Sequence, residues 1–268
     1  MTDLQFEKFR TLIYNEFGNT VSDDKRTTLE IKVDKIIRRY HEGKLTVDEY
    51  YKKLLEDGKS SATWNYFVDE ITVHKTNFFR ENDHFKYIES HINEIMDSIP
   101  SIHLKKEIRV WCAAASTGEE PYSIAMMLKD ILPAGYTFKF LATDISEKVL
   151  NKAVKGEYPD AIKNDIPSDK LQKYFDKTLD GYVVKDELKK LVTFRKFNLC
   201  DAFLFKHKFD IIFCRNVMIY FDDELRIKIF KKIYDALSPN GLFILGLSES
   251  VGLKNKEFKL IGSSIYKK

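Results

Sequence analysis

A short loop of small residues and carboxylates is the first stretch of the sequence whose residue types could bind a ligand. Residues 112–123 read Cys-Ala-Ala-Ala-Ser-Thr-Gly-Glu-Glu-Pro-Tyr-Ser. Small residues let the backbone approach a ligand closely, and Ser116 or Thr117 could cap the helix that follows. A phosphate-binding loop would continue with Lys-Ser or Lys-Thr. This loop continues with Glu119 and Glu120, which repel phosphate and suit a cationic ligand group.

A third acidic residue follows the next apolar segment. Asp144 ends residues 138–144, about 25 residues after the loop, and an acid at this place in a βαβ unit accepts hydrogen bonds from ribose hydroxyls. A ligand with a ribose, a cationic group and no phosphate fits S-adenosylmethionine (SAM) better than NAD or ATP. Each acid alone could be structural, because Glu119 and Glu120 complement a helix dipole and Asp144 could cap a strand. Their order within one unit favours the ligand site.

The elements that must position these residues alternate between strands and helices from residue 108 onward. Strands are expected at 108–113, 138–144, 192–197, 209–214 and 241–246, and helices at 121–131, from 146, and at 222–237. This alternation predicts βαβ units and a largely parallel sheet, which binds ligands at the carboxyl ends of its strands. Residues 258–266 are expected to form a closing hairpin.

Two regions depart from this alternation. Residues 170–196 contain an Asp-Gly turn between apolar residues, which predicts a small antiparallel insertion. The first 83 residues show helical periodicity, with helices expected at 25–40 and 64–73 and a capping box formed by Thr46 and Glu49. We therefore divide the chain into an all-helical domain, 1–83, and an α/β domain, 84–268, with the insertion at about 170–196.

Composition excludes several classes of protein. The chain has 44 Lys and Arg against 41 Asp and Glu, a net charge of +3, which is too small to argue for a nucleic-acid partner. The sequence contains no run of about 18 apolar residues and no secretory leader, so we expect no insertion into a membrane. Cys112, Cys200 and Cys214 show no metal-ligand spacing. The expected compartment is the cytoplasm, and no metal site is predicted.

Four stretches of the sequence resemble the CheR family of chemotaxis-receptor glutamate O-methyltransferases. They are residues 76–80 (Thr-Asn-Phe-Phe-Arg), 110–123, 142–145 (Ala-Thr-Asp-Ile) and 213–222 (Phe-Cys-Arg-Asn-Val-Met-Ile-Tyr-Phe-Asp). The resemblance covers nearly the whole chain. It implies a Rossmann-like class I SAM methyltransferase sheet with a small all-helical N-terminal domain and a small antiparallel β insertion. It also implies methyl transfer from SAM to glutamate side chains of bacterial chemoreceptors, with S-adenosylhomocysteine as product.

The resemblance also assigns site residues. It implies SAM contacts at Thr76, Arg80, Glu119, Asp144, Asn198, Leu199, Arg215 and Asn216, and it implies that Arg80 and Tyr220 face the reacting methyl group. Asp222 is expected to cap the next helix. One position departs from the family pattern, because His74 stands where family members have asparagine, and no cofactor contact is carried over to it.

Basic residues form a stripe on the helix expected at 25–40. With Leu29 at 0°, Lys32, Lys35, Arg38 and Arg39 lie between about 180° and 300°, and the apolar residues centre near about 25°. For an arbitrary protein, a solvated helix face would explain this stripe. The resemblance implies docking onto the acidic methylation helices of receptors, assisted by electrostatic steering. Residues 176–181 form a shorter, less glycine-rich loop than in relatives that bind a C-terminal receptor peptide, so we expect that tether not to be required.

The chemistry leaves two alternatives to receptor methylation. A glutamate carboxylate, with a pKa of about 4.3, is already ionised and needs no general base, which agrees with the absence of an obvious catalytic dyad. The first alternative is a SAM methyltransferase for another acceptor. The second is a non-catalytic SAM-sensing module, which the presence of both Arg80 and Tyr220 disfavours. A nucleic-acid methyltransferase is weaker still, since the basic stripe lacks interleaved aromatic residues.

Overall fold

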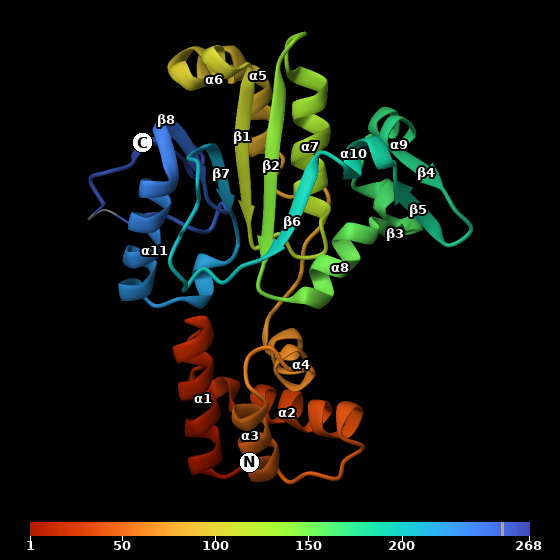
Figure 1. Cartoon of the computed structure of the whole chain (residues 1–268), viewed down its shortest axis with the longest axis vertical. Helices are drawn as coiled ribbons and strands as arrows, with labels where there is room; N and C mark the ends of the chain where they lie inside the picture. Colours follow the sequence, from red (N-terminus) through yellow and green to blue (C-terminus); the bar gives the residue numbers. More distant parts are fainter. Residues whose placement is uncertain (253–254) are drawn as a thin grey trace.

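The computed structural model describes residues 1–252 and 255–268 and begins with a small helical domain (Figure 1). Its elements are α1 (Asp3–Phe17), a 3₁₀ turn η1 (Asp23–Lys25), α2 (Arg26–Tyr40), α3 (Val47–Asp57) and α4 (Ala62–Ile71). The helices expected at 25–40 and 64–73 correspond to α2 and α4. The predicted capping box is confirmed, because Glu49 accepts from the Thr46 amide at 2.7 Å and the Thr46 hydroxyl accepts from the Glu49 amide.

The second domain contains a mostly parallel sheet, as predicted. Its strands are β1 (Glu107–Ala113), β2 (Thr137–Asp144), β6 (Val192–Lys196), β7 (Phe209–Cys214), β8 (Leu237–Ile244), β9 (Lys259–Gly262) and β10 (Ile265–Lys267). They lie in the order β6-β2-β1-β7-β8-β10-β9. The first five are parallel, and β9 and β10 form the expected antiparallel hairpin at the β8 edge.

Both faces of the sheet are buried along most of the central strands β1, β7 and β8, which is why these strands read as largely apolar runs. Val110 and Cys112 belong to a core shared with α5 (Asp83–Ser98) and α7 (Glu119–Ile131). The alternate residue Trp111 belongs to a second core with α11 (Asp223–Ala236). The short helices α6 (Pro100–Lys105) and α8 (Glu147–Lys155) and the 3₁₀ turn η3 (Met218–Tyr220) complete this part.

The antiparallel insertion begins earlier than expected. Its sheet has the order β3-β5-β4 and consists of β3 (Glu157–Pro159), β4 (Phe175–Lys177) and β5 (Gly181–Val184). The 3₁₀ turn η2 (Asp160–Asn164) and α9 (Ser168–Tyr174) lie within it, and α10 (Asp186–Lys189) follows. Residues 192–196 lie within the range predicted for the insertion, but they form β6 of the main sheet, which confirms the strand predicted at 192–197. Three-residue strands carry too little periodicity to be recognised in the sequence.

The predicted caps of two helices have different outcomes. Asp222 caps α11 as expected, accepting from the Leu225 amide at 2.8 Å. The prediction that Ser116 or Thr117 caps α7 is wrong. Gly118 is the N-cap residue, with φ at 97°, and the Ser116 hydroxyl instead donates to the His74 carbonyl at 2.9 Å.

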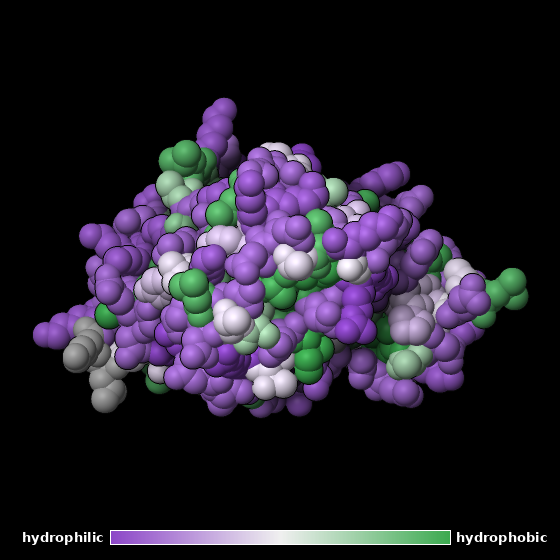
Figure 2. Space-filling model, turned by 90° about the horizontal axis from the view of Figure 1, so that it is seen from below, coloured by the Kyte–Doolittle hydropathy of each residue, from purple (hydrophilic) through white to green (hydrophobic). Residues whose placement is uncertain are grey.

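The helical domain contacts the edge of the sheet formed by the carboxyl ends of its strands (Figure 1). Asn19 and Phe221 form an isolated antiparallel bridge, and the Thr20 amide donates to the Tyr220 carbonyl at 3.0 Å. The Ser146 hydroxyl donates to Asp69 at 2.6 Å. The helical end of the molecule has a mainly hydrophilic surface with small apolar areas (Figure 2). Within the described residues, no helix is both long and apolar enough to span a bilayer.

We expect Gly18→Ala to destabilise the protein more than Gly43→Ala, its matched control. Both glycines have left-handed backbones, with φ at 72° and 68°, and this conformation costs alanine about 1–2 kcal/mol. A Cβ on Gly18 would lie 2.1 Å from Leu225 Cδ2, whereas a Cβ on Gly43 would meet nothing within 4 Å. Overpacking should add about 1–3 kcal/mol at Gly18 alone. Urea unfolding measures both, and equal losses would contradict the close packing of α1 on α11.

Candidate functional site

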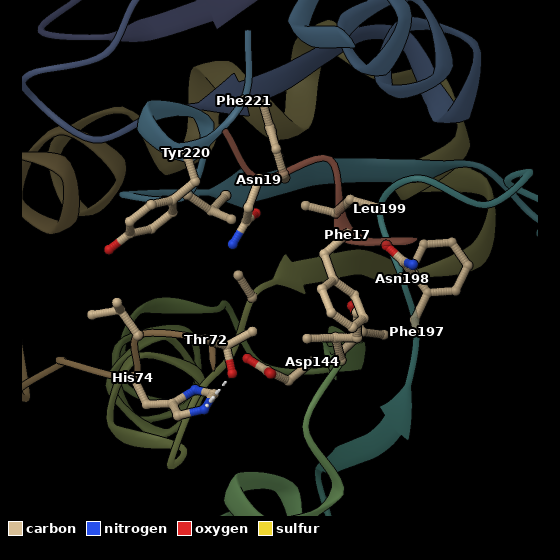
Figure 3. A pocket seen from close by; sticks show the side chains of 15 residues that line it. Phe17, Asn19, Thr72, His74, Asp144, Phe197, Asn198, Leu199, Tyr220 and Phe221 are labelled. Carbon is tan, nitrogen blue, oxygen red and sulfur yellow. Dashed lines mark hydrogen bonds between the residues drawn. The ribbon is translucent and has the colours of Figure 1, made fainter. Parts of the chain in front are cut away.

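A cavity lies where the helical domain meets the carboxyl ends of β1 and β2 (Figure 3). Its wall on the α/β side includes Ala114, Thr143, Asp144, Phe197, Asn198, Leu199, Val217, Tyr220 and Phe221. The helical domain and the segment after it contribute Phe17, Asn19, Thr72, Val73 and His74. Four of the predicted site residues therefore line one cavity, namely Asp144, Asn198, Leu199 and Tyr220.

Asp144 provides a buried negative charge in this cavity. Its side chain accepts from the Ser116 amide at 2.8 Å and from the Ser146 amide at 3.0 Å. Burial raises the pKa of Asp144, while these amides and the nearby His74 act in the opposite direction. A carboxylate can accept more than two hydrogen bonds, so Asp144 retains capacity for ligand hydroxyls.

The loop between β1 and α7 is shaped by left-handed residues. Ala114 and Ser116 have φ at 60° and 49°, a conformation that costs about 1–2 kcal/mol for each residue other than glycine. The loop is held in place because the Ala115 amide donates to the Thr143 carbonyl at 2.8 Å and the Ser116 amide donates to Asp144. Strain retained in this way is typical of ligand-binding loops.

The two glutamates of this loop have different roles. Glu119 accepts from the Thr117 hydroxyl at 2.6 Å, and burial raises its pKa. Glu120 does not face a ligand, contrary to our expectation for the pair. It is buried and forms an ion pair with Arg215 at 3.0 Å. Sequence spacing could not reveal this partner, because Arg215 follows β7 and lies 95 residues further along the chain.

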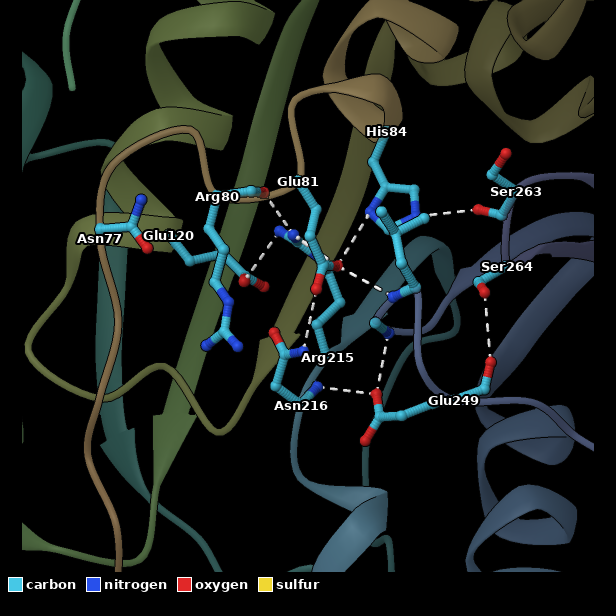
Figure 4. Close-up of polar contacts among 12 residues, drawn as sticks. Asn77, Arg80, Glu81, His84, Glu120, Arg215, Asn216, Glu249, Ser263 and Ser264 are labelled. Carbon is cyan, nitrogen blue, oxygen red and sulfur yellow. Dashed lines mark hydrogen bonds and ion pairs between the residues drawn. The ribbon is translucent and has the colours of Figure 1, made fainter.

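Arg215 lies at the centre of a buried polar network (Figure 4). Its fully buried side chain pairs with Glu120 and with Glu81, each at 3.0 Å, and donates to the Arg80 carbonyl. The Asn216 amide group donates to Glu81 at 3.0 Å. Hydrogen bonds from Asn216 and Arg215 outweigh the effect of burial and lower the pKa of Glu81. The Nη donors of Arg215 and the amide group of Asn216 thus bind interior groups, whereas Arg215 Nε is buried without a partner within the described residues. Contact of either side chain with SAM stays a prediction.

Arg80 and Tyr220 lie close enough to influence each other electrostatically. Burial raises the pKa of Tyr220, and the positive charge of Arg80 partly opposes this rise. The Arg80 side chain donates to the Lys75 carbonyl at 3.2 Å and is directed away from the Arg215 network (Figure 4). Thr76, the remaining predicted contact, lies with Arg80 on the linker between α4 and α5, residues 72–82, and is half-buried.

Several cavity residues were not predicted. Asn198, by contrast, was predicted to contact SAM. Its side-chain amide donates to the Glu16 carbonyl at 2.7 Å, and its side-chain oxygen accepts from the Cys200 amide. Phe17 and Asn19 enter the cavity from α1 and the turn after it (Figure 3). His74 also lines the cavity, and its ring nitrogen Nε2 forms a hydrogen bond with the Thr72 hydroxyl at 2.8 Å. No local signal could place these residues, because their position depends on how the two domains pack.

The predicted basic stripe is partly paired. Lys32 donates to the Ile71 carbonyl at 3.0 Å, Lys35 pairs with Glu70 at 2.6 Å, and Arg38 pairs with Asp34 at 2.9 Å. Arg39 lies over the Tyr40 ring at 5.5 Å. Lys35, Arg38 and Arg39 are exposed, and exposed ion pairs contribute only about 0–1 kcal/mol. These three side chains can therefore exchange their present partners for others.

Comparison with known proteins gives matches to both domains. The family described as "CheR methyltransferase, all-alpha domain" matches residues 4–72, and "CheR methyltransferase, SAM binding domain" matches residues 74–267. A chemotaxis protein methyltransferase of Borreliella burgdorferi is 36% identical, covering 100% of this chain and 95% of the relative. One of Escherichia coli is 36% identical, covering 99% and 91%. The solved structure of PKMT2 from Rickettsia typhi with AdoHcy is 16% identical, covers 52% of this chain and 21% of the other, and has a TM-score of 0.34.

We expect Asp144→Ala to weaken SAM binding by about 10- to 100-fold, because hydrogen bonds to a charged acceptor contribute about 1.5–3 kcal/mol. Calorimetry with SAM measures the loss. The substitution also frees two backbone amides, so a SAM analogue lacking a ribose hydroxyl is needed as a second probe. If Asp144 binds the ribose, the losses from the variant and from the analogue will not add. Fully additive losses, or unchanged affinity, would contradict the assignment.

Proposed function

Because the chain belongs to the CheR methyltransferase family and contains its SAM-binding domain, we propose that it methylates glutamate side chains of bacterial chemoreceptors in sensory adaptation. The cofactor is SAM. The proposed products are glutamate methyl esters and S-adenosylhomocysteine, and the proposed compartment is the cytoplasm, where the receptor methylation helices lie.

The cavity suits SAM in its donor set. Asp144 offers a buried carboxylate that retains free lone pairs, as a ribose requires. Asn198 and Leu199 form a wall whose main-chain groups can contact a base. The loop before α7 carries Glu119 in place of the lysine of a phosphate site, which favours a cationic group. We therefore assign SAM contacts to Thr76, Arg80, Glu119, Asp144, Asn198, Leu199, Arg215 and Asn216, as the resemblance implies.

The observation that best supports a carboxylate as the methyl acceptor is that Arg80 has no carboxylate partner. Among residues 1–252 and 255–268, no carboxylate lies within ion-pair distance of its guanidinium. It lies near Tyr220, which lines the SAM cavity. An unpaired guanidinium beside this cavity fits an anionic acceptor, which it can hold through two parallel hydrogen bonds.

SAM supplies the methyl group as a sulfonium when bound. The residues of the chain then hold and orient the acceptor, whose carboxylate is already ionised and needs no base. Arg80 fixes the direction of its oxygens. Tyr220 remains protonated, since its pKa is raised, and can donate a hydrogen bond. Alignment of this kind contributes about 7–11 kcal/mol to lowering a barrier. The buried rings of Phe17 and Phe221 line the cavity and make part of its wall apolar.

The proposal is tested by transfer of labelled methyl from SAM to a receptor cytoplasmic fragment. The expected product is a base-labile ester on glutamate. Small carboxylic acids and a fragment with its methylated glutamates replaced by alanine serve as controls. Transfer to the acids but not to the fragment, or a base-stable product, would favour another acceptor and overturn the proposal.

We expect Arg80→Ala to reduce methyl transfer by about 100-fold or more, the usual cost of removing one preorganised charged donor. The fold should persist, because the side chain of Arg80 bonds only to the Lys75 carbonyl within the described residues. Arg80→Lys keeps the charge and loses the bidentate geometry, so it should recover only part of the activity. Near-normal turnover by a folded Arg80→Ala variant would remove Arg80 from the mechanism.

The exposed part of the basic stripe is proposed as the receptor-docking surface, with Lys32 at its edge. The C-terminal receptor peptide is proposed not to be required, because residues 178–180 leave only a short turn between β4 and β5. Lys35 and Arg39 are the best sites to reverse, since neither contributes to the buried core.

We expect the double change Lys35→Glu and Arg39→Glu to slow methylation of the receptor fragment several-fold at low salt, because it removes electrostatic steering. The effect should shrink as salt screens the charges. The matched control is Lys8→Glu and Lys52→Glu, which reverses two lysines on other helices of the same domain. Equal rates for wild type and the stripe variant at low salt would refute docking through this surface.

A further inference from the structure

Glu249 is a buried carboxylate just beyond β8 whose partners are all backbone amides. It is 6% exposed. One oxygen accepts from the Asn216 amide at 2.7 Å and from the Gly246 amide at 2.8 Å, and the other accepts from the Ile219 amide at 3.3 Å. No cationic side chain within the described residues forms an ion pair with it. A buried charge is costly unless it is compensated, so these three amides account for its presence.

The amides come from the ends of two neighbouring strands, β7 and β8, and the carboxylate joins them. Gly246 follows β8, whereas Asn216 and Ile219 belong to the loop after β7 that continues into Tyr220. A Cβ on Gly246 would lie 2.5 Å from Asn216 Nδ2 and 2.9 Å from Glu249 Oε2. The close approach of the two segments therefore requires glycine here. Asn216 has a left-handed backbone with φ at 56°, so the loop adopts a conformation that needs external support.

Glu81 connects the linker that carries Arg80 to the loop after β7 that carries Tyr220. It accepts from the side chains of Arg215 and Asn216 and from the Leu247 amide, all at 3.0 Å. Its own neighbour is Arg80, whose carbonyl accepts from Arg215. Two carboxylates thus connect the linker that carries Arg80, the loop that carries Tyr220 and the end of β8 (Figure 4).

We propose that Glu249 is a positioning residue that fixes the position of Tyr220 relative to Arg80. Glu81 holds the segment that carries Arg80 against the same loop. Neither glutamate lines the SAM cavity. They act through the main chain and through Arg215 and Asn216, without touching the acceptor. This inference rests on the proposed function for its effect on turnover, but its effect on the loop is independent of the substrate.

The test compares Glu249→Gln with Asp210→Asn. Asp210 is a matched control, because it is 3% exposed and accepts from the Arg109 amide at 2.9 Å and the Ser238 hydroxyl at 2.8 Å near the opposite end of β7. Glutamine has one accepting oxygen and an NH2 donor in place of the second, so at least one of the Asn216 and Ile219 amides loses its acceptor. We expect kcat on the receptor fragment to fall by about 10-fold or more with KM for SAM changed by less than about twofold. Amide exchange in residues 216–221 should accelerate.

Asp210→Asn should lower stability while leaving kcat and exchange in residues 216–221 as in wild type. Unchanged kcat and exchange in folded Glu249→Gln would overturn the inference. So would equal changes in both variants, which would indicate general destabilisation. If wild-type protein fails to methylate the fragment, the proposed function fails, and the exchange comparison still decides whether Glu249 holds the loop.

Discussion

The site depends on the burial of one guanidinium. Arg215 follows β7 with its side chain fully buried, and a charge in that position persists only if it is paired and hydrogen-bonded. Glu120 supplies one partner from the first turn of α7, and Glu81 supplies another from the linker between the domains. Three parts of the chain must therefore meet at Arg215. Their meeting orders the segment that carries Arg80 and pairs Glu120 internally, whereas Glu119 stays outside this network.

The sequence was sufficient to predict most helices and strands and to place an acidic residue at the end of β2. Apolar runs flanked by turns predicted the parallel strands. Local order along the chain predicted that Asp144 ends a strand of the ligand site, and Asp144 ends β2 and lines the cavity, while its contact with a ribose stays a prediction. The partners of Glu120 could not be predicted, since a glutamate in the first turn of a helix reads as a dipole partner. Glu81 and Glu249, which lie outside helices, were missed because their partners are distant. Each binds groups far away in sequence, Glu249 reaching Asn216 across 33 residues, and no periodicity records such contacts.

The domain boundary is also where sequence reasoning is weakest. The two domains read as separate units, one helical and one α/β, yet the cavity has walls from both. Phe17 and Asn19 complete it from the helical side, and Thr72 and His74 complete it from the linker. The helical domain thus forms part of the cavity that we propose as the SAM site, as well as the proposed docking surface for the receptor. The relatives of Borreliella burgdorferi and Escherichia coli are matched over 95% and 91% of their length.

The short bridge between Asn19 and Phe221 has a consequence for building hybrid enzymes. The backbone of Thr20 is bonded to the carbonyl of Tyr220, and the hydroxyl of Tyr14 donates to Asp222 at 2.7 Å. If the helical domain docks the receptor as proposed, a domain transplanted from a relative to change receptor specificity would place different residues at positions 14–20 against the loop that carries Tyr220. Residues 14–20 and 220–222 should therefore be inherited from the same parent. Under the proposed docking role of the helical domain, an exchange of receptor specificity between relatives requires that these residues be exchanged together.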